Sequence, residues 1–285
     1  MKYLILGSQG MAGHMVSLYL NEKGHEVTGF ARTKSLLVNT IVGDATNLPF
    51  LSETILNNDF DIIVNCIGIL NQFAENKKSN AVFLNSFIPH YLADITKNKS
   101  TKIVHISTDC VFSGNTGPYT EYSFRDGNSF YDRSKALGEL EDDKNITIRT
   151  SIIGPDIKPN GIGLLNWFME QDGSINGYTK SMWTGQTTLQ LAKTIEFIAG
   201  NKITGLYNMV PCTNISKYEL LKLMNKHIRN NTVLIKPVDG VNLDKTLIRT
   251  KLDFDYSIPN YEIMIEELAE WMRQHRWLYP HYEII

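Results

Sequence analysis

The chain has 285 residues, of which 42% are hydrophobic, so it is long enough to bury a full core as one large domain or two smaller ones. Its 28 Lys and Arg residues nearly balance its 30 Asp and Glu residues, which excludes the strongly basic surface typical of nucleic-acid-binding proteins. Chemistry on a small molecule is therefore the expected class of function.

The cysteines and the N-terminus predict a cytoplasmic protein. Cys66, Cys110 and Cys212 lie too far apart for a zinc or dithiol motif and are expected to be free thiols of a reducing compartment. The histidines show no metal-ligand spacing, so no metal is expected. The apolar run between Lys2 and Gly7 is too short for a signal peptide, and no run reaches the roughly 18 residues of a membrane span.

Short apolar runs alternate with helical patterns in the first half of the chain. Apolar runs without polar alternation are typical of strands covered on both faces, and they lie at 3–6, 27–30, 62–64 and 103–106. Residues 146–150 are expected to form a further strand. Amphipathic patterns predict helices at 11–23, 51–58, 81–97 and 130–140. This order predicts an α/β fold with a Rossmann-like, doubly wound parallel sheet and right-handed crossovers.

The regular alternation stops after residue 150, where Pro155, Pro159, Gly161 and Gly163 cluster. We expect a Rossmann domain over residues 1–154 and a smaller α/β region over residues 155–285, with a chain that can cross back between them. The second region has helical patterns at 188–199, 216–227 and 260–275, and short strands near 206–210 and 233–235.

A glycine triplet, Gly7-x-x-Gly10-x-x-Gly13, follows the first predicted strand and opens the first helix. Glycines let the backbone approach a pyrophosphate, which the N–H groups and the dipole at a helix start stabilise. The first two glycines are one residue further apart than in the GxGxxG fingerprint. Their position still favours a dinucleotide site that includes Gln9 and Met11, and a tight turn without a ligand is the alternative.

The end of the second strand bears on the choice between nicotinamide cofactors. An acidic residue there would bind the ribose 2′-hydroxyl of NAD, but the chain has Phe30, Ala31 and Arg32. A guanidinium can bind the 2′-phosphate of NADP and can stack on adenine. NADPH is therefore the expected cofactor, with NADH as the alternative, and a solvated arginine is the structural alternative for Arg32.

Further cofactor contacts are expected where later strands end, because ligands of open α/β sheets bind there. Asp44 either accepts from the adenine amino group or caps the next turn. Asn85 lies in an apolar helical pattern, where a buried amide needs partners, so it either orients the surroundings of Lys135 or makes a structural hydrogen bond. The other residues expected along the cofactor are Ala45, Cys66, Ile67, Gly68 and Ser107.

Tyr131 and Lys135 are four residues apart on a predicted helix, so their side chains share one face. An ammonium beside a phenol favours the phenolate, and the pKa of the tyrosine is expected to fall from about 10 toward the working range of a general acid. Ser107, Thr108 and Asp109 end a parallel strand above the same crevice, where a hydroxyl can bond a substrate carbonyl. An ordinary surface pair is the alternative for Tyr131 and Lys135.

Four segments in order, "GSQGMAGH", "STDCVFSG", "YTEYSFRDGNSFYDRSKALGE" and "IRTSIIGP", resemble the extended short-chain dehydrogenase/reductases. Within them the chain is similar, over essentially its whole length, to the dTDP-4-dehydrorhamnose reductase-like family of sugar-nucleotide reductases. The resemblance implies hydride transfer from NADPH to the C4 carbonyl of a nucleotide-linked 6-deoxy-4-keto-hexose, for polysaccharide synthesis. It makes Tyr131 the proton donor, places Lys135 on the nicotinamide ribose, lets Thr108 polarise the carbonyl, and implies a homodimer.

The chain departs from this family where the sugar binds. Cys110 stands where the family usually has tyrosine, and Ile152 where it often has tryptophan. These smaller side chains leave room for a bulkier sugar, such as a UDP-linked 2-acetamido-2,6-dideoxy-4-hexulose in place of dTDP-4-dehydrorhamnose. The other expected substrate contacts are Asp109, Asn166 and Trp183, the last within "WTGQTT", which is similar to a segment of the family's sugar-nucleotide pocket.

Two other functions stay open at this point. A nucleotide-sugar 4-epimerase uses a similar Tyr/Lys site with a retained NAD, but no acidic residue stands at positions 30–32. A non-catalytic NADP-binding regulatory subunit needs no catalytic residues, whereas Thr108, Tyr131 and Lys135 are all present.

Overall fold

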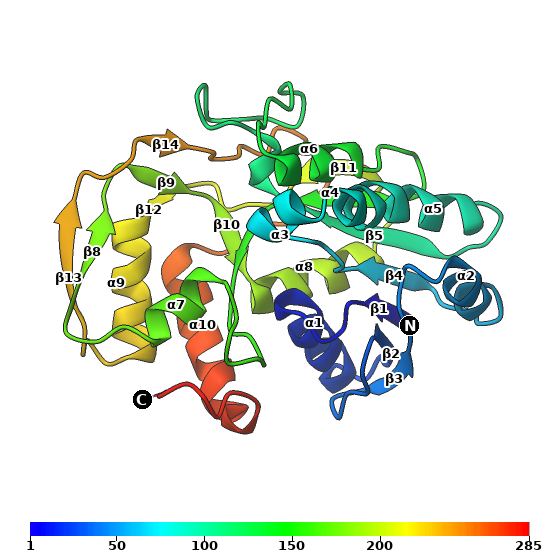
Figure 1. Ribbon diagram of the computed structural model, residues 1–285, viewed down its shortest axis with the longest axis horizontal. Coiled ribbons are helices and arrows are strands. Elements are labelled where there is room, and N and C mark those ends of the chain that lie inside the picture. The colour runs from blue at the N-terminus through cyan, green and yellow to red at the C-terminus, as the bar shows by residue number, and fades with distance from the viewer. Residues whose placement is uncertain (285) are drawn as a thin grey trace.

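The computed structural model describes residues 1–284 and is built around a seven-stranded sheet in the order β11-β6-β5-β4-β1-β2-β3 (Figure 1). All neighbouring strands run parallel. The strands are β1 (Lys2–Leu6), β2 (Glu26–Ala31), β3 (Asn39–Val42), β4 (Ile62–Asn65), β5 (Lys102–Ser107), β6 (Ile146–Arg149) and β11 (Gly205–Asn208). The predicted doubly wound fold is confirmed.

The apolar strands are covered by helices on both faces. In β1, Tyr3 and Ile5 join one core while Leu4 and Leu6 join the other, because successive side chains of a strand point to opposite faces. The first core packs on α1 (Met11–Glu22), α8 (Thr188–Ala199) and α10 (Tyr261–Gln274). The second packs on α2 (Leu48–Leu56) and α5 (Ile88–Ile95).

The helix predicted over residues 81–97 is interrupted. The segment consists of α4 (Lys78–Ala81), a π-helical turn (Val82–Phe87) and α5. Pro89 has no N–H to donate to the carbonyl four residues earlier, which belongs to Asn85, so a regular α-helical ladder cannot run through this point. That carbonyl lies against Gly138, where a Cβ would come within 1.9 Å of it.

A smaller region follows β6 (Figure 1). Its strands form two pairs, β10-β7 and β13-β8, and a three-stranded sheet, β12-β9-β14. They are β7 (Ser151–Ile153), β8 (Ser174–Tyr178), β9 (Ser181–Trp183), β10 (Gly185–Thr187), β12 (Ile215–Ser216), β13 (Leu234–Val238) and β14 (Leu243–Asp244). Its helices include α7 (Leu164–Met169) and α9 (Lys217–Ile228).

The chain returns to the central sheet after entering this region. Strand β11 pairs with β6, with Gly205 opposite Ile146, and α8 packs on α1. The expected division at residue 154 stays a prediction. Within residues 1–284, no helix is long and apolar enough to cross a membrane.

Candidate active site

The glycine loop forms an open cradle at the end of β1. Gly7 has φ +77° and donates its N–H to the Phe30 carbonyl at 2.9 Å. Gly10 is the N-cap residue of α1 and has no side chain to cap the helix, so the first N–H groups are free for a ligand. A Cβ at Gly13 would lie 2.1 Å from the Gly7 oxygen, so only glycine lets the helix approach the loop this closely. This arrangement fits the pyrophosphate of a dinucleotide.

Side chains at the end of β2 border this cradle. Gln9 donates to the Thr33 carbonyl at 2.6 Å and accepts from the Thr33 hydroxyl at 2.7 Å, which ties the glycine loop to the strand end. Arg32 is exposed next to this contact. Asp44 accepts from the Thr46 N–H at 2.9 Å and from its hydroxyl at 2.8 Å, and these bonds lower the pKa of its carboxyl. Asp44 therefore caps a turn, and its contact with adenine stays a prediction.

Asn85 holds the loop that follows β4. Its Oδ1 accepts from the Ile69 N–H at 2.8 Å, and its Nδ2 donates to the Ile69 carbonyl at 2.9 Å. Nδ2 also donates to the Ser134 hydroxyl at 3.0 Å, on α6 (Phe130–Leu137). These hydrogen bonds link the strand-end loop to the helix of Tyr131 beside Lys135, and a contact of Asn85 with the cofactor stays a prediction.

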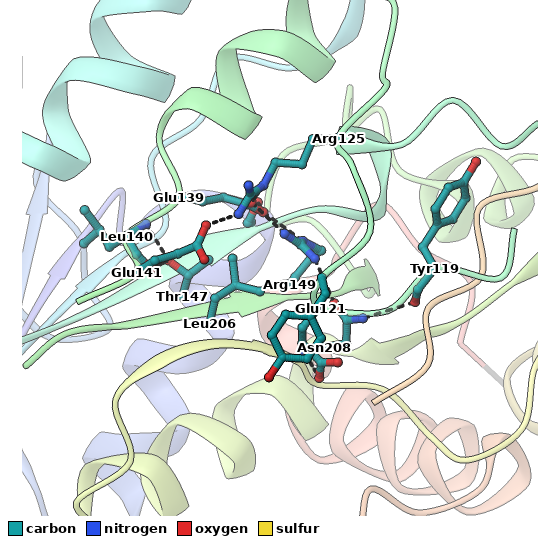
Figure 2. A network of polar contacts seen from close by, with 12 residues as sticks. Tyr119, Glu121, Arg125, Glu139, Leu140, Glu141, Thr147, Arg149, Leu206 and Asn208 are labelled. Carbon is teal, nitrogen blue, oxygen red and sulfur yellow. Dashed lines mark hydrogen bonds and ion pairs between the residues drawn. The ribbon is translucent and has the colours of Figure 1, made fainter. Parts of the chain in front are cut away.

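A buried ion pair anchors the end of β5 (Figure 2). Ser107 donates to the Glu139 carboxylate at 2.7 Å, and Arg149 donates to the same carboxylate at 2.9 and 2.7 Å. Although burial raises the pKa of Glu139, the bonds and charge of Arg149 hold it below its usual value. Arg149 also reaches Asn208 on β11 at 3.3 Å. The hydroxyl of Ser107 is thus held by Glu139, and its contact with a cofactor stays a prediction.

The structure brings Thr108, Asp109, Cys110 and Tyr131 together. The Thr108 hydroxyl accepts from the Cys110 N–H at 3.1 Å and donates to Asp109 at 3.1 Å. It also lies close enough to Tyr131 to lower the pKa of the phenol. Tyr131 is positioned by α6, whose first turn is closed by a capping box between Ser129 and Asp132.

The predicted lowering of the Tyr131 pKa was wrong. Burial raises this pKa, and the nearby Cys110 and Asp109 add to the effect beyond what Thr108 offsets. Lys135 does not offset it, because its amine donates to the Ile106 carbonyl at 2.7 Å and lies 3.3 Å from His105 Nε2. Burial lowers the pKa of Lys135 itself to about 8. The phenol is therefore protonated at neutral pH, as a proton donor must be.

Two short helices cause this burial, one that the sequence did not predict and one that lies almost wholly before the predicted start at residue 81. They are α3 (Asn71–Asn76) and α4, which pack on α6. Ala74 and Ala81 contact Tyr131, leaving it 7% exposed. Glu75 holds the cover in place by accepting from the Phe130 N–H at 2.6 Å. Four- and six-residue helices are too short to show a clear apolar period, so the sequence carried no signal for them.

The expected substrate residues of the second region lie in different settings. Trp183 donates its ring N–H to the Ser151 hydroxyl at 2.8 Å, next to Ile152 on β7. Asn166 is 2% exposed, donating to the Gly161 carbonyl at 2.7 Å and accepting from the Tyr282 hydroxyl at 2.6 Å. The Asn166 amide is thus occupied within the fold, and its contact with substrate stays a prediction.

Two lysines that the sequence did not single out act electrostatically on Asp109. Lys217 follows β12 and Lys245 follows β14, the strands on either side of β9. Both are half-buried, and both lower the pKa of Asp109 against the larger effect of its burial. The sequence gives little signal for this pair, because it is the pairing of β9 with two very short strands that brings them near Asp109. Within residues 1–284, no group of three or more His, Cys, Asp or Glu side chains is placed to hold a metal ion.

A family model described as the RmlD substrate binding domain matches residues 1–251. A dTDP-4-keto-6-deoxy-D-glucose reductase of Streptomyces niveus is 23% identical over 83% of this chain and 82% of its own length. A probable low-salt glycan biosynthesis reductase, Agl14 of Haloferax volcanii, is 29% identical over 47% of this chain, and the match spans only 46% of that relative.

Solved structures share the fold. The dTDP-4-dehydrorhamnose reductase of Bacillus anthracis, in complex with NADP, superposes with a TM-score of 0.80 at 20% identity. The match covers 95% of this chain and 99% of that one. The likeness therefore extends through the central sheet and the smaller region.

Proposed function

Because the chain belongs to the family described as the RmlD substrate binding domain, we propose that it is an NADPH-dependent reductase of nucleotide sugars. Its substrate is a nucleotide-linked 6-deoxy-4-keto-hexose, and the enzyme reduces the C4 carbonyl of this sugar. The product serves cell-surface polysaccharide synthesis. The observation that carries this proposal is the grouping of Thr108 and Tyr131 at the end of β5 in a chain whose uncapped glycine-loop helix fits a dinucleotide. The names of the reductases from Streptomyces niveus and Haloferax volcanii support it.

The cofactor is held by the backbone of the glycine loop and by Arg32. The N–H groups at the start of α1 would bind the pyrophosphate, and the exposed guanidinium of Arg32 would bind the 2′-phosphate. Bound NADPH supplies the hydride to C4. Gln9, Met11, Ala45 and the strand-end residues after β4 remain proposed contacts along it.

The proton comes from Tyr131. Burial keeps its phenol neutral, so it can donate to the carbonyl oxygen as the charge develops. The Thr108 oxygen accepts from the Cys110 N–H, and its hydrogen is now donated to Asp109. When substrate is bound, this hydrogen would be donated to the substrate oxygen instead. A second donor at the same oxygen stabilises the developing negative charge.

The diphosphate of the substrate needs compensating charge. We assign this role to Lys217 and Lys245, since they flank β9 and act electrostatically on Asp109. Two ammonium groups on this side of the site favour an anionic substrate over a free sugar.

The sugar is a further choice within the same reaction. Cys110 packs in the Tyr131 cluster, and its small side chain leaves room for a 2-acetamido group. We therefore propose a UDP-linked 2-acetamido-2,6-dideoxy-4-hexulose, with dTDP-4-dehydrorhamnose as the alternative. A cytoplasmic location and a homodimer stay predictions.

The function is tested by NADPH oxidation with purified protein and each of the two 4-keto sugars. We expect oxidation of one NADPH per sugar reduced and faster turnover of the UDP sugar. A clear preference for the dTDP sugar rejects the sugar choice but keeps the reductase. A 4-epimerase would show bound NAD and no net NADPH consumption, and a regulatory subunit would show no turnover at all.

A further inference from the structure

His105 lies at the centre of the sheet and is not among the residues predicted from the sequence. It is fully buried on β5, with Asn65 of β4 directly opposite. Its Nδ1 lies 3.2 Å from Asn65 Nδ2, and its Nε2 lies 3.3 Å from the Lys135 amine. The ring therefore connects the end of β4 to a proposed cofactor-binding lysine.

Hydrogen-bond polarity sets the direction of this connection. The Ile67 N–H donates to Asn65 Oδ1 at 3.1 Å, so the other end of the amide, Nδ2, faces His105 as a donor. His105 Nδ1 must then accept. Burial, followed by the charges of Lys135 and His90, holds the pKa of His105 well below its usual value. The neutral ring therefore carries its one hydrogen on Nε2.

The Nε2–H group points at an amine that must accept it. An ammonium has no lone pair, whereas a neutral amine has one and still keeps hydrogens to donate. Lys135 donates to the Ile106 carbonyl at 2.7 Å and can accept from His105 only as the amine. A charged Lys135 would set two donors against each other in a buried site, which costs free energy.

We propose that His105 is a positioning residue whose Nε2–H group favours the neutral amine of Lys135 in the protein without bound cofactor, and so lowers the pH above which Lys135 loses its charge. The catalytic meaning of this inference rests on the proposed function. The proposed place of Lys135 is on the nicotinamide ribose, where an ammonium donates stronger hydrogen bonds to the hydroxyls than a neutral amine does. His105 thus acts on the reaction through Lys135 and touches no reacting atom.

Burial and the other titratable groups around Lys135 change its pKa in opposite directions. Burial lowers the pKa of Lys135, while Glu139 and Cys66 raise it. Burial raises the pKa of the Cys66 thiol to about 12 and also raises that of Tyr131, so both are neutral near pH 7. His105 is the neighbour whose N–H bond directly favours the neutral amine.

The tautomer is tested in the whole protein, without substrate or cofactor, by ¹⁵N NMR with labelled histidine and lysine. We expect an unprotonated Nδ1 and a protonated Nε2 in His105 above about pH 8, where the Lys135 amine is mostly neutral. Lys135, assigned by the loss of its signal in Lys135→Arg, should titrate with a pKa of about 8. The opposite tautomer, or a Lys135 pKa at the ordinary value of about 10.4, overturns the inference.

His105→Gln gives a second readout, because an amide oxygen can accept from an ammonium. We expect the pKa of Lys135 to rise by about one unit and the alkaline limit of turnover to move up with it. His90→Gln is the matched control, since that imidazole bonds the Leu137 carbonyl and not Lys135. Lys102, whose pKa burial also lowers to about 8, is the internal reference and should not change. A folded His105→Gln protein with an unchanged Lys135 pKa contradicts the inference.

Failure of the proposed function would look different. If neither keto sugar is reduced while NMR gives the expected tautomer and titration, the reductase proposal fails and the role of His105 in setting the charge of Lys135 stands. If turnover is normal but the tautomer is reversed, the reductase stands and the inference falls.

Discussion

Tyr131 and Lys135 share a helix face, yet burial moves their pKa values in opposite directions. Burial disfavours the charged form of a group, so it raises the pKa of a phenol and lowers that of an amine. Tyr131 is therefore neutral near pH 7, whereas Lys135 loses its charge only as the pH rises through about 8. The reduction then starts with a proton already on Tyr131, and the charge on Lys135 is available to respond to its surroundings.

Tyr131→Phe should reduce turnover by at least about two orders of magnitude, because a positioned general acid contributes about 10²- to 10⁴-fold. The affinity for NADPH should change little, since the lost hydroxyl acts on the substrate oxygen. Steady-state kinetics and a cofactor titration measure the two effects. Tyr122→Phe is the control, because that side chain is 78% exposed. Unaltered turnover in Tyr131→Phe rules out the assignment.

Lys245→Gln should raise the KM for the nucleotide sugar by about tenfold or more while changing kcat little, because a hydrogen bond to a charged group contributes about 1.5–3 kcal/mol. Lys180→Gln serves as the comparison, since Lys180 is exposed and pairs with Asp239. An equal rise in KM in both variants, or no rise in either, would show that Lys245 does not bind the diphosphate.

Helix α1 depends on its approach to the glycine loop, where the limit is set by backbone atoms. Gly13→Ala places a Cβ 2.1 Å from the Gly7 oxygen, which no side-chain rotation can relieve. We expect the affinity for NADPH to fall by more than about tenfold and the Tm to decrease. Gly200→Ala at the end of α8 is the control, because its added Cβ meets only ordinary contacts at 3.7 Å. Wild-type affinity in Gly13→Ala would remove the glycine loop from the cofactor site.

The ion pair between Glu139 and Arg149 joins β6 to the segment after α6 and, through Ser107, to the end of β5. Glu139→Gln leaves the fully buried Arg149 without a compensating charge. Arg125, which is partly exposed, loses the same partner. Removing one partner of a buried pair costs about 3–5 kcal/mol of unfolding free energy. Urea unfolding at pH 7 measures the difference, and a loss below about 1 kcal/mol would contradict it.

The same pair makes stability depend on pH. The folded state depresses the pKa of Glu139, so its contribution is fully present above the unfolded value of about 4.5 and is lost as the pH falls through the lower folded value. The difference in unfolding free energy between the wild type and Glu139→Gln should therefore shrink below about pH 4.5. A difference that stays constant in acid would assign the stabilisation to packing.

The central sheet and its main helices were predictable because their signals are local. Apolar runs without alternation indicate strands covered on both faces, and α8, α9 and α10 are long enough to show a helical period. The short strands β7, β9, β10, β12 and β14 have two or three residues each, so no period exists to read. Their pairing depends on contacts made across the fold.

The sequence proposes the residues of the candidate site, but their electrostatics could not be predicted from it. The glycine loop, the strand-end Thr108 and the helix of Tyr131 and Lys135 follow one another in the sequence, and each has a local signal. The neutral state of Tyr131 follows from burial by α3 and α4, and the direction of the contacts around His105 follows from the Ile67 N–H bond. Such effects arise from the packing of segments distant in sequence, which no single stretch reveals.

The late arrival of β11 bears on how the protein is made. Until residues 205–208 leave the ribosome, β6 ends the nascent sheet with its backbone groups uncovered, and Arg149 lacks its contact with Asn208. A polypeptide that ends near residue 154 would keep this unpaired edge of β6 exposed to other chains. Expression of the two halves as separate polypeptides should therefore give aggregates, whereas truncation and domain-exchange designs that keep β6 and β11 together preserve the sheet.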